Sequence, residues 1–293
     1  MQVITIAQNK GGAGKTTTAK LVATGLAKRG YRTLAIDLDS QCNLSSRFVQ
    51  MDISMSDMKG KIPPLHPEEV ELREESPDWS GRSSSADIFL AREIYPYPTP
   101  VENLELIPGN GDELPQVGLV TANEVVKKIH EQLKLFVNSE GLREAYDIVI
   151  IDTDPSKSPL PVSAIRAATH LIIPTDVDPM GLEGLHGMLS MWMAENRRRP
   201  AGEAVELIGI LPNKIRNNVA SQNASLAALR ESNATRDLMF PGQLSARSAF
   251  SDSDHEAIRF TSVLDLPPSN KARKEAEAML DHVARRLEVG RHV

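Results

Sequence analysis

A glycine-rich turn lies between a short apolar run and an amphipathic segment at the start of the chain. Val3–Ala7 is apolar, and Asn9–Lys15 reads NKGGAGK. Thr16–Lys28 then carries apolar residues at the i, i+3, i+4 and i+7 spacing of one helix face. The segment Gln2–Ser40 therefore predicts a strand, a phosphate-binding loop and a helix, in that order.

The chemistry of a phosphate group explains these residue types. Unpaired N–H groups at a helix N-terminus point at the anion, and the helix dipole favours its negative charge. Gly11, Gly12 and Gly14 let the backbone close around phosphates because they carry no Cβ. Lys15 is expected to reach the β- and γ-phosphates, and the Thr16 hydroxyl is expected to ligate Mg²⁺. The predicted nucleotide-binding residues of the loop are Gly11, Gly12, Ala13, Gly14, Lys15, Thr16 and Thr17.

Two positions of this loop depart from the usual phosphate-loop pattern. Asn9 stands where the pattern has its first glycine, five residues before Gly14, and a second lysine, Lys10, precedes the double glycine. The segment KGGAGKTT resembles the deviant Walker A loop of the ParA/MinD ATPase superfamily. The resemblance implies that Lys10 crosses an ATP-sandwiched homodimer to contact the partner's nucleotide, while Lys15 is the ordinary loop lysine. We therefore expect both lysines to be catalytic, and Lys10 to have no role inside its own subunit.

Two carboxylates follow the second predicted strand, Arg32–Ile36, in the order Asp37-Leu38-Asp39-Ser40. Carboxylates two residues apart just past a strand end can both face a phosphate site, although aspartate is also common in turns. The ParA family has DxDPQ here, and the resemblance implies that Asp39 positions the attacking water while Asp37 lies nearer the Mg²⁺ water shell. Ser40 replaces the family's proline, which predicts a less rigid loop.

A continuous β-branched run ends in a third carboxylate. Asp147–Asp152 predicts a buried parallel strand that delivers the Asp152 carboxylate to Mg²⁺, as a Walker B aspartate does. The predicted metal ligands are Thr16, Asp37 and Asp152. ParA proteins usually continue D-x-P-P, whereas this sequence has Asp154. Asp154 either pairs with Lys157, which we favour because uncompensated charge near phosphate is costly, or adjusts the placement of metal or water.

Composition excludes several classes of protein. The chain has 293 residues, a net charge of −6 and one cysteine, Cys42. One cysteine excludes a disulfide framework and a cysteine-based metal cluster, which argues against the nitrogenase iron protein, a relative with the same loop. No apolar run approaches the ~20 residues that span a bilayer, and Met1 leads directly into the first strand, so we expect a cytoplasmic protein. Because the net charge is negative, any DNA contact requires a local basic patch.

Residues 51–85 differ in character from the rest of the chain. They contain eight acidic and four basic side chains, and Trp79 is the only Phe, Trp or Tyr among them. Their weak periodicity predicts an inserted, partly mobile polar loop within a single P-loop ATPase domain, 1–293, rather than a second domain. A solvated insertion is favoured over a partner-docking element, because such a composition buries little apolar area.

Strands alternate with helices over the remaining length. The predicted strands include 101–108, 170–175, 207–214 and 237–240, and the longer predicted helices include 122–137 and 270–287. This alternation implies right-handed crossovers between parallel strands. The predicted fold class is α/β, a three-layer arrangement with a mostly parallel twisted sheet, helices on both faces, and ligands at the carboxyl ends of the strands.

Three residues far along the chain are assigned to the nucleotide by the resemblance. Glu183 lies in MGLEGL, similar to the family's LEGL element near the dimer interface, and is expected to contact the ribose. Asn213 stands where the predicted strand in 207–214 runs into a loop, at about the place where relatives read adenine. Pro241 begins a loop that is similar to the family's purine-side loop.

The C-terminal segment Asn270–Leu287 is amphipathic. MinD proteins end in a basic, bulky helix that enters membranes. This segment has no aromatic residue and mixes Glu275, Glu277 and Asp281 with its cations. A helix docked on the core is therefore favoured over a membrane anchor.

The resemblance covers nearly the whole chain except residues 51–85. It implies a ParA-like ATPase of weak intrinsic activity that uses ATP and Mg²⁺, in the short form without an N-terminal helix-turn-helix domain. Such proteins bind double-stranded DNA non-specifically as the ATP dimer on the nucleoid, and release it after hydrolysis stimulated by a ParB-like or other cargo adaptor. They segregate plasmid or chromosome DNA. The candidate DNA contacts are Lys214, Arg216, Arg247, Lys271, Arg273 and Lys274.

Three alternatives remain open at this point. The same mechanism can position a protein cargo, such as a carboxysome or a chemotaxis cluster. A MinD-like membrane-cycling regulator shares the loop, but the C-terminal segment opposes it. A metabolic ATP-dependent ligase similar to dethiobiotin synthetase shares the fold, but would need an acidic or amine substrate pocket that the sequence does not reveal.

Overall fold

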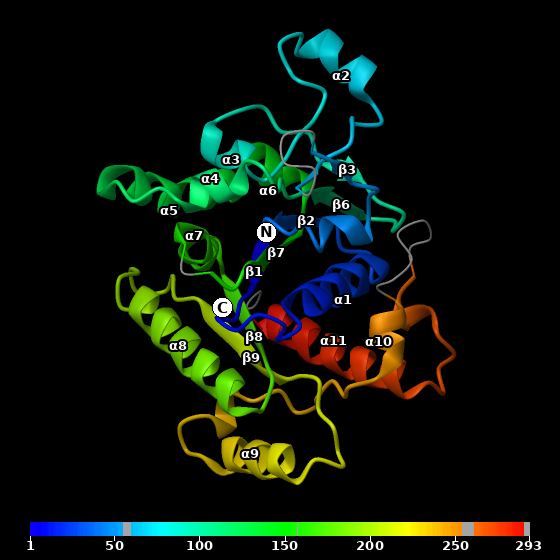
Figure 1. Cartoon of the computed structure of the whole chain (residues 1–293), viewed down its shortest axis with the longest axis vertical. Coiled ribbons are helices and arrows are strands. Elements are labelled where there is room, and N and C mark those ends of the chain that lie inside the picture. Colours follow the sequence, from blue (N-terminus) through cyan, green and yellow to red (C-terminus); the bar gives the residue numbers. More distant parts are fainter. Residues whose placement is uncertain (55–59, 157, 254–260, 290–293) are drawn as a thin grey trace.

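The computed structural model describes residues 1–54, 60–156, 158–253 and 261–289. The strands of its main sheet are β1 (Gln2–Ile6), β2 (Thr33–Leu38), β5 (Tyr97–Pro98), β6 (Leu104–Ile107), β7 (Ile148–Thr153), β8 (His170–Thr175) and β9 (Glu206–Pro212). Among the described residues, these seven strands lie in the order β5-β6-β2-β7-β1-β8-β9. Figure 1 labels all of them except β5. All neighbours pair parallel except β5, which pairs antiparallel with β6 at one edge.

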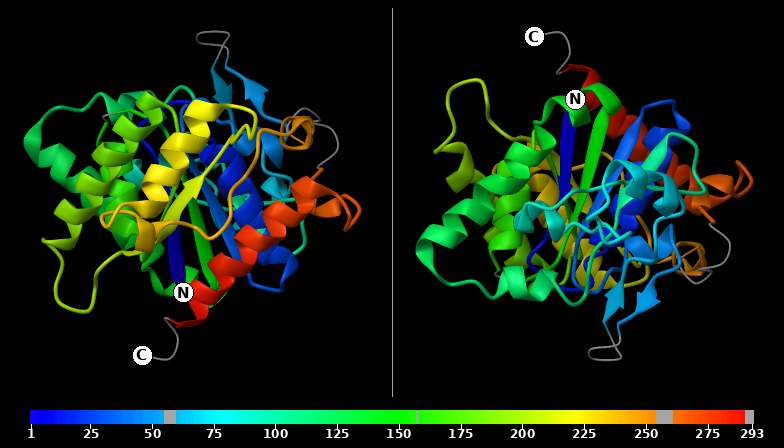
Figure 2. Two further views of the ribbon diagram at one scale, coloured as in Figure 1. Left: turned by 90° about the horizontal axis from the view of Figure 1, so that it is seen from below. Right: turned by 90° about the horizontal axis from the view of Figure 1, so that it is seen from above.

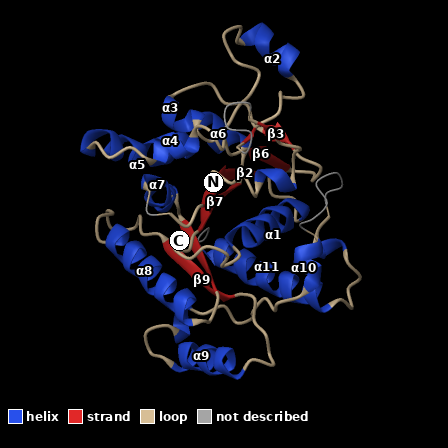
Figure 3. Cartoon of the chain, viewed as in Figure 1, coloured by secondary structure: helices blue, strands red, loops and turns tan. Residues whose placement is uncertain are grey.

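Helices cover both faces of the sheet (Figure 3). The longer ones are α1 (Lys15–Lys28), α5 (Asn123–Val137), α7 (Pro159–Ala167), α8 (Pro179–Asn196), α9 (Ala220–Glu231) and α11 (Lys271–Val289). Ile4 and Ile6 of β1 share a buried cluster with apolar residues of α1 and α11, whereas Val3 packs in the cluster that α5 and α7 contribute to. Alternate side chains of a strand point to opposite faces, so one strand supplies both cores. The predicted three-layer α/β fold is confirmed.

Shorter elements connect these layers. The helices are α2 (Glu69–Glu75), α3 (Asp87–Leu90), α4 (Leu114–Gly118), α6 (Glu140–Ala145) and α10 (Ser248–Asp252), and the 3₁₀ turns are η1 (Ser45–Arg47), η2 (Arg236–Leu238) and η3 (Val263–Asp265). A separate two-stranded pair is formed by β3 (Asp52–Ile53) and β4 (Lys61–Ile62).

The C-terminal helix α11 packs beside α1 (Figure 2). Its buried side chains are Ala272, Ala276, Met279, Leu280, Val283 and Leu287. Gly25 of α1 permits the close approach, because a Cβ there would lie 2.3 Å from Leu280 Cδ1. The predicted docking of this helix on the core is confirmed. No helix in the described part of the chain combines the length and apolar content needed to cross a membrane.

The segment 51–85 has more structure than its composition predicts. It holds the β3–β4 pair and α2, which projects away from the sheet (Figure 1). Its aromatic side chains form a small core with two tyrosines of the following segment: the rings of His66 and Tyr97 lie 4.7 Å apart, as do those of Trp79 and Tyr95. A few large rings bury enough area to hold an otherwise polar segment against the domain.

The predicted strand 237–240 is wrong. The chain there forms the 3₁₀ turn η2, and Met239 makes only an isolated bridge to Ile210 of β9. Phe240 still donates its N–H to the carbonyl of Ile210 at 2.9 Å. Pro241 follows and has no N–H to continue a ladder, so the pairing stops after one residue.

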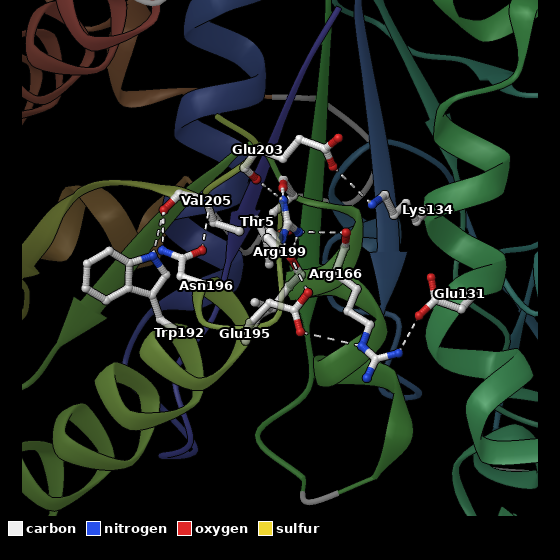
Figure 4. A network of polar contacts seen from close by, with 12 residues as sticks. Thr5, Glu131, Lys134, Arg166, Trp192, Glu195, Asn196, Arg199, Glu203 and Val205 are labelled. Carbon is white, nitrogen blue, oxygen red and sulfur yellow. Dashed lines mark hydrogen bonds and ion pairs between the residues drawn. The ribbon is translucent and has the colours of Figure 1, made fainter. Parts of the chain in front are cut away.

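Arg199 ties α7 to the end of α8 at the amino ends of the strands (Figure 4). Its guanidinium donates to the carbonyl oxygens of Ile165, Arg166 and Ala168 at 2.9, 2.8 and 3.0 Å. The side chain is 8% exposed and also pairs with Glu195 at 3.3 Å. The Ile165 carbonyl also accepts the N–H of Ala168 at 3.2 Å, whereas those of Arg166 and Ala168 lie at the helix C-terminus, where carbonyl oxygens lack intrahelical partners and Arg199 takes the place of water.

Candidate active site

The glycine-rich loop connects the carboxyl end of β1 to the N-terminus of α1. Gly12 and Gly14 have φ angles of +78° and +88°, in the region that favours glycine. A Cβ at Gly14 would also lie 2.0 Å from Asn213 Nδ2, so the position has no room for one. A Cβ at Gly11 would meet only Pro155, at 3.8 Å. The loop geometry therefore explains Gly12 and Gly14, whereas nothing among the described residues requires glycine at position 11.

Lys15 is the first residue of α1 and its side chain is folded into the loop. The residue is 6% exposed, and Nζ lies 3.4 Å from the carbonyl oxygen of Lys10. Burial lowers the pKa of Lys15, while the charges of Asp152, Asp39 and Asp154 act in the opposite direction. Its ammonium thus lies at a helix N-terminus among carboxylates.

Asp37 is fully buried at the end of β2 and shapes the loop that follows. Its Oδ2 accepts hydrogen bonds from the Ser45 hydroxyl at 2.6 Å and the Ser45 N–H at 2.8 Å. Its Oδ1 accepts the N–H of Asp39 at 3.1 Å. Burial raises the pKa of Asp37 to about 6, and the Ser45 hydrogen bonds limit the rise. Ser45, which the sequence analysis did not identify, fixes this carboxylate.

Asp152 lies next to Asp37 in the sheet, and both of its carboxylate oxygens are buried. Neither oxygen has a hydrogen-bond partner of normal geometry among the described residues. Burial raises the pKa of Asp152 well above its ordinary value and the charge of Asp37 adds to the rise, whereas Thr16 and Lys15 favour the ionised form.

This arrangement fits a hard divalent cation. A buried carboxylate without a partner is costly unless a cation joins it, and Mg²⁺ prefers the carboxylate and hydroxyl oxygens that Asp152 and Thr16 offer. The described residues contain no group of three or more His, Cys, Asp or Glu side chains placed to hold a metal alone. A metal here would complete its shell with water or with oxygens of a bound phosphate.

Asp39 and Asp154 approach the loop from β2 and β7. Asp39 is 8% exposed, and its Oδ1 accepts the N–H of Gln41 at 2.9 Å. The Asp154 carboxyl is partly buried, and one of its oxygens has no hydrogen-bond partner within the described residues. Burial raises the pKa of Asp154, and the charge of Asp39 acts in the same direction. Lys157, the predicted partner of Asp154, lies outside the described residues.

Lys10 has partners within its own chain, which the sequence analysis did not predict. Its Nζ lies 2.7 and 2.9 Å from the two carboxylate oxygens of Asp178 and 3.2 Å from Asp176 Oδ2. Both aspartates follow β8, at the same edge of the sheet as the loop. Carboxylates just past a strand end were a readable signal in Asp176-Val177-Asp178, but their contact with Lys10 depends on the register of β1 and β8.

Asn213 and Lys214 hold the loop from the side of β9. Asn213 Nδ2 donates to the carbonyl of Ala13 at 2.9 Å, and Lys214 Nζ donates to that of Gly12 at 2.6 Å. A groove of about 550 Å³ opens beside them. It is lined by Thr17, Arg47, Asn213, Lys214, Arg216, Leu244, Ser245, Ala246, Arg247, Ser248, Phe250 and Ser251. Neither Glu183, exposed on α8, nor Pro241 lines this groove.

The six candidate DNA contacts fall into two groups. Arg247 pairs with Glu275 at 2.7 Å and Arg273 with Glu277 at 2.7 Å, and Lys214 is bound to the loop. The side chains that are exposed and have neither an ion pair nor a hydrogen bond in the described part of the chain are Arg216, Lys271 and Lys274.

Known proteins resemble this chain in both sequence and fold. A family model described as an AAA domain matches residues 1–198. A putative replication protein A from Rhizobium rhizogenes is 29% identical over 254 residues, 82% of this chain and 57% of that protein. The sporulation initiation inhibitor protein Soj from Bacillus subtilis is 30% identical over 190 residues, 64% of each chain. The chain thus aligns with less than two thirds of the length of these relatives.

Among solved structures, an ATP complex of a McdA variant from Cyanothece has a TM-score of 0.73 and 20% identity, and covers 97% of this chain and 96% of its own. At that identity the likeness concerns the fold.

Proposed function

This chain belongs to the ParA-type partition ATPases, and we propose that it binds ATP with Mg²⁺ at the loop between β1 and α1, forms a homodimer in that state, and binds duplex DNA as the dimer. Hydrolysis, stimulated by a ParB-like or other adaptor, then releases the DNA. The proposed role is the segregation of plasmid or chromosome DNA on the nucleoid, in the cytoplasm.

One observation carries this proposal: the carboxyl ends of three adjacent strands bring Lys15, Asp39 and Asp152 to the same loop. β1 leads into the loop, β2 ends before Asp39, and β7 contains Asp152. Ile6 pairs with Asp152 and Asp37 pairs with Asp152, so the three strand ends are in register. A cation for phosphate, a carboxylate for metal and a carboxylate for water are the groups that phosphoryl transfer to water requires.

Different residues of the chain have separate roles in the proposed reaction. Bound ATP with Mg²⁺ supplies the γ-phosphate on which the reaction takes place. The loop N–H groups and Lys15 neutralise phosphate charge, and Thr16 and Asp152 hold the metal. Asp39 keeps one oxygen without a protein partner in the described chain, and it positions the attacking water. Asp37 supports this carboxylate through its bond to the Asp39 N–H.

The groove beside Asn213 and Lys214 suits the base and ribose of the nucleotide. It adjoins the loop through Thr17, and Leu244 and Phe250 give it an apolar wall. Pockets of several hundred Å³ with mixed apolar and polar walls are typical of small-molecule sites. In this proposal Asn213 reads adenine, while Glu183 reaches the nucleotide from α8 and Pro241 borders the base only once the dimer forms.

Arg216, Lys271 and Lys274 are the cations best placed for DNA. Their charges are not neutralised by carboxylates in the described chain, unlike those of Arg247 and Arg273. A homodimer presents two copies of each, and binding that neutralises several phosphates weakens steeply as salt increases. DNA affinity would therefore follow the nucleotide state through dimerisation.

Two alternatives differ in what they predict. The same cycle can position a protein cargo, and the McdA fold likeness is compatible with either cargo. A MinD-like membrane cycle is opposed by α11, whose apolar face is buried against α1. We therefore propose no membrane partner.

Gel filtration with light scattering tests the proposed dimer. The wild-type chain should elute as a monomer with Mg²⁺ and ADP, and as a dimer with Mg²⁺ and a non-hydrolysable ATP analogue. Equal masses in the two nucleotides would contradict the proposed switch.

A further inference from the structure

Lys10 is held by two carboxylates that follow β8. Its ammonium contacts both oxygens of Asp178 and one oxygen of Asp176, and its side chain is only 16% exposed. Burial lowers the pKa of Lys10, but the two carboxylates outweigh burial and raise it overall. Lys10 in this state therefore points into its own subunit.

The contact is built into rigid parts of the fold. Asp178 is the N-cap of α8 and accepts the N–H of Gly181 at 2.7 Å. α8 packs closely on the first residues of the loop, because a Cβ at Gly184 would lie 3.3 Å from Lys10 Cβ and one at Gly187 2.7 Å from Asn9 Nδ2. Two small residues thus let the helix and the loop touch, and the carboxylates are fixed in place before any partner arrives.

A cross-subunit contact and this contact compete for the same ammonium. A lysine has one Nζ, so Lys10 must leave Asp176 and Asp178, at least in part, to reach a nucleotide in a second copy of the chain. Breaking the contact of Lys10 with the two aspartates costs free energy in each subunit. This cost makes the free energy of dimerisation less favourable, once for each subunit.

We propose that Asp176 and Asp178 are positioning residues that retain Lys10 within its own subunit and so set the protein concentration at which the ATP-bound dimer forms. The inference rests on the proposed function, because it assumes that Lys10 acts across the dimer. It adds a pair of residues that oppose dimerisation until nucleotide contacts outweigh them.

Asp178→Asn is the sharpest variant. Asparagine remains a good N-cap, so α8 keeps its start while Lys10 loses the charge of its nearest partner. Sedimentation velocity with Mg²⁺ and a non-hydrolysable ATP analogue should give a dimer dissociation constant about tenfold lower than wild type, which corresponds to about 1.4 kcal/mol. Asp176→Asn, which leaves the cap untouched, should shift it in the same direction. Asp281→Asn on α11, which removes a surface pair with Arg29, is the matched control and should leave it unchanged.

A thermodynamic cycle shows whether the effect passes through Lys10. In a Lys10→Ala background, Asp178→Asn should change the dissociation constant less than twofold, because the retained ammonium is gone. An equal tightening with and without Lys10 would overturn the inference. So would a weaker dimer in both single variants, since it would make the aspartates partners of Lys10 in the dimer.

A second readout examines the pair in the monomer and is independent of dimerisation. The rate at which a soluble amine-reactive ester modifies Lys10 can be followed by peptide mass spectrometry without nucleotide. Asp178→Asn should speed this modification several-fold relative to Lys271, and an unchanged rate would overturn the inference. If Asp178→Asn speeds the modification of Lys10 in the monomer while the wild-type chain does not dimerise with ATP, the proposed function is contradicted. The contact of Lys10 with the aspartates is then still supported.

Discussion

Asp37 and Asp152 lie opposite each other in register across β2 and β7, and both are completely buried. Asp37 is satisfied by Ser45 and by the Asp39 N–H, whereas the oxygens of Asp152 have no hydrogen-bond partner of normal geometry in the described residues. Two adjacent carboxylates inside a sheet are unfavourable unless one is protonated or a cation joins them. The strand pair thus carries an electrostatic cost that a metal would remove.

Asp152→Asn should make the nucleotide-free protein more stable while it weakens Mg²⁺-dependent nucleotide binding. Folding raises the pKa of Asp152, so the folded state holds the proton more tightly and the free energy of unfolding falls as pH rises above the ordinary carboxylate value. At pH 7 in EDTA the variant should gain about 1–3 kcal/mol by urea unfolding, and should lose part of the wild-type pH dependence. A variant less stable than wild type would contradict the electrostatic cost assigned to the adjacent carboxylates of Asp37 and Asp152.

Lys15→Ala should cause a severe loss of nucleotide binding. Lys15 is the cation inside the loop, and its removal leaves phosphate charge facing Asp39, Asp152 and Asp154. Titration of the monomer with a fluorescent ADP derivative should show an affinity at least about tenfold lower than wild type. Lys10→Ala is the control, because Lys10 points away toward Asp178, and it should bind ADP normally.

Asp39→Ala should keep ATP binding and the dimer but lose hydrolysis. In the proposed mechanism its second carboxylate oxygen, which has no hydrogen-bond partner among the described residues, positions water, while other residues hold phosphate and metal. Loss of such a group typically lowers turnover roughly 10²- to 10⁴-fold. Phosphate release should fall in that range in the presence of DNA, and a turnover near the wild-type rate would refute the assignment to Asp39.

Arg199→Ala should destabilise the fold without touching the active site. Removing the guanidinium takes the donor from the carbonyl oxygens of Arg166, Ala168 and Glu203, while Glu195 keeps its pair with Arg166; loss of such buried hydrogen bonds typically costs about 1–3 kcal/mol. Arg197→Ala, an exposed neighbour, should stay within about 0.5 kcal/mol of wild type. Urea unfolding measures both, and equal stabilities for the two variants would contradict the role given to Arg199.

The parts of the site that are local in sequence could be predicted, because the residues that form a strand, a glycine turn and a helix follow one another within a short segment. The loop at Gly12–Lys15 and the buried strand before Asp152 are of this kind. The partners of Lys10 lie more than 160 residues away and were missed, since periodicity does not reveal which strands become neighbours. Ser45 was missed for a related reason: its hydroxyl reaches Asp37 only after the chain turns back.

Two differences between expectation and structure have a physical cause in composition. The segment 51–85 has a polar composition, yet its Trp79 and His66 pack against Tyr95 and Tyr97, which lie outside it. A core shared with a later segment cannot be predicted from the composition of 51–85 alone. Residues 237–240 are predicted to form a strand because they end in apolar residues. The 3₁₀ turn before Met239 and the proline after Phe240 limit the pairing to one bridge, between Met239 and Ile210.

Binding to random-sequence duplex DNA in two nucleotide states tests the central claim most directly. At low salt, a gel shift with Mg²⁺ and a non-hydrolysable ATP analogue should show tight binding that weakens steeply as salt is raised, and Mg²⁺ with ADP should show none. The combined variant Arg216→Ala, Lys271→Ala and Lys274→Ala should keep the ATP dimer and lose the shift. Equal DNA binding in ATP and ADP would contradict the nucleotide switch.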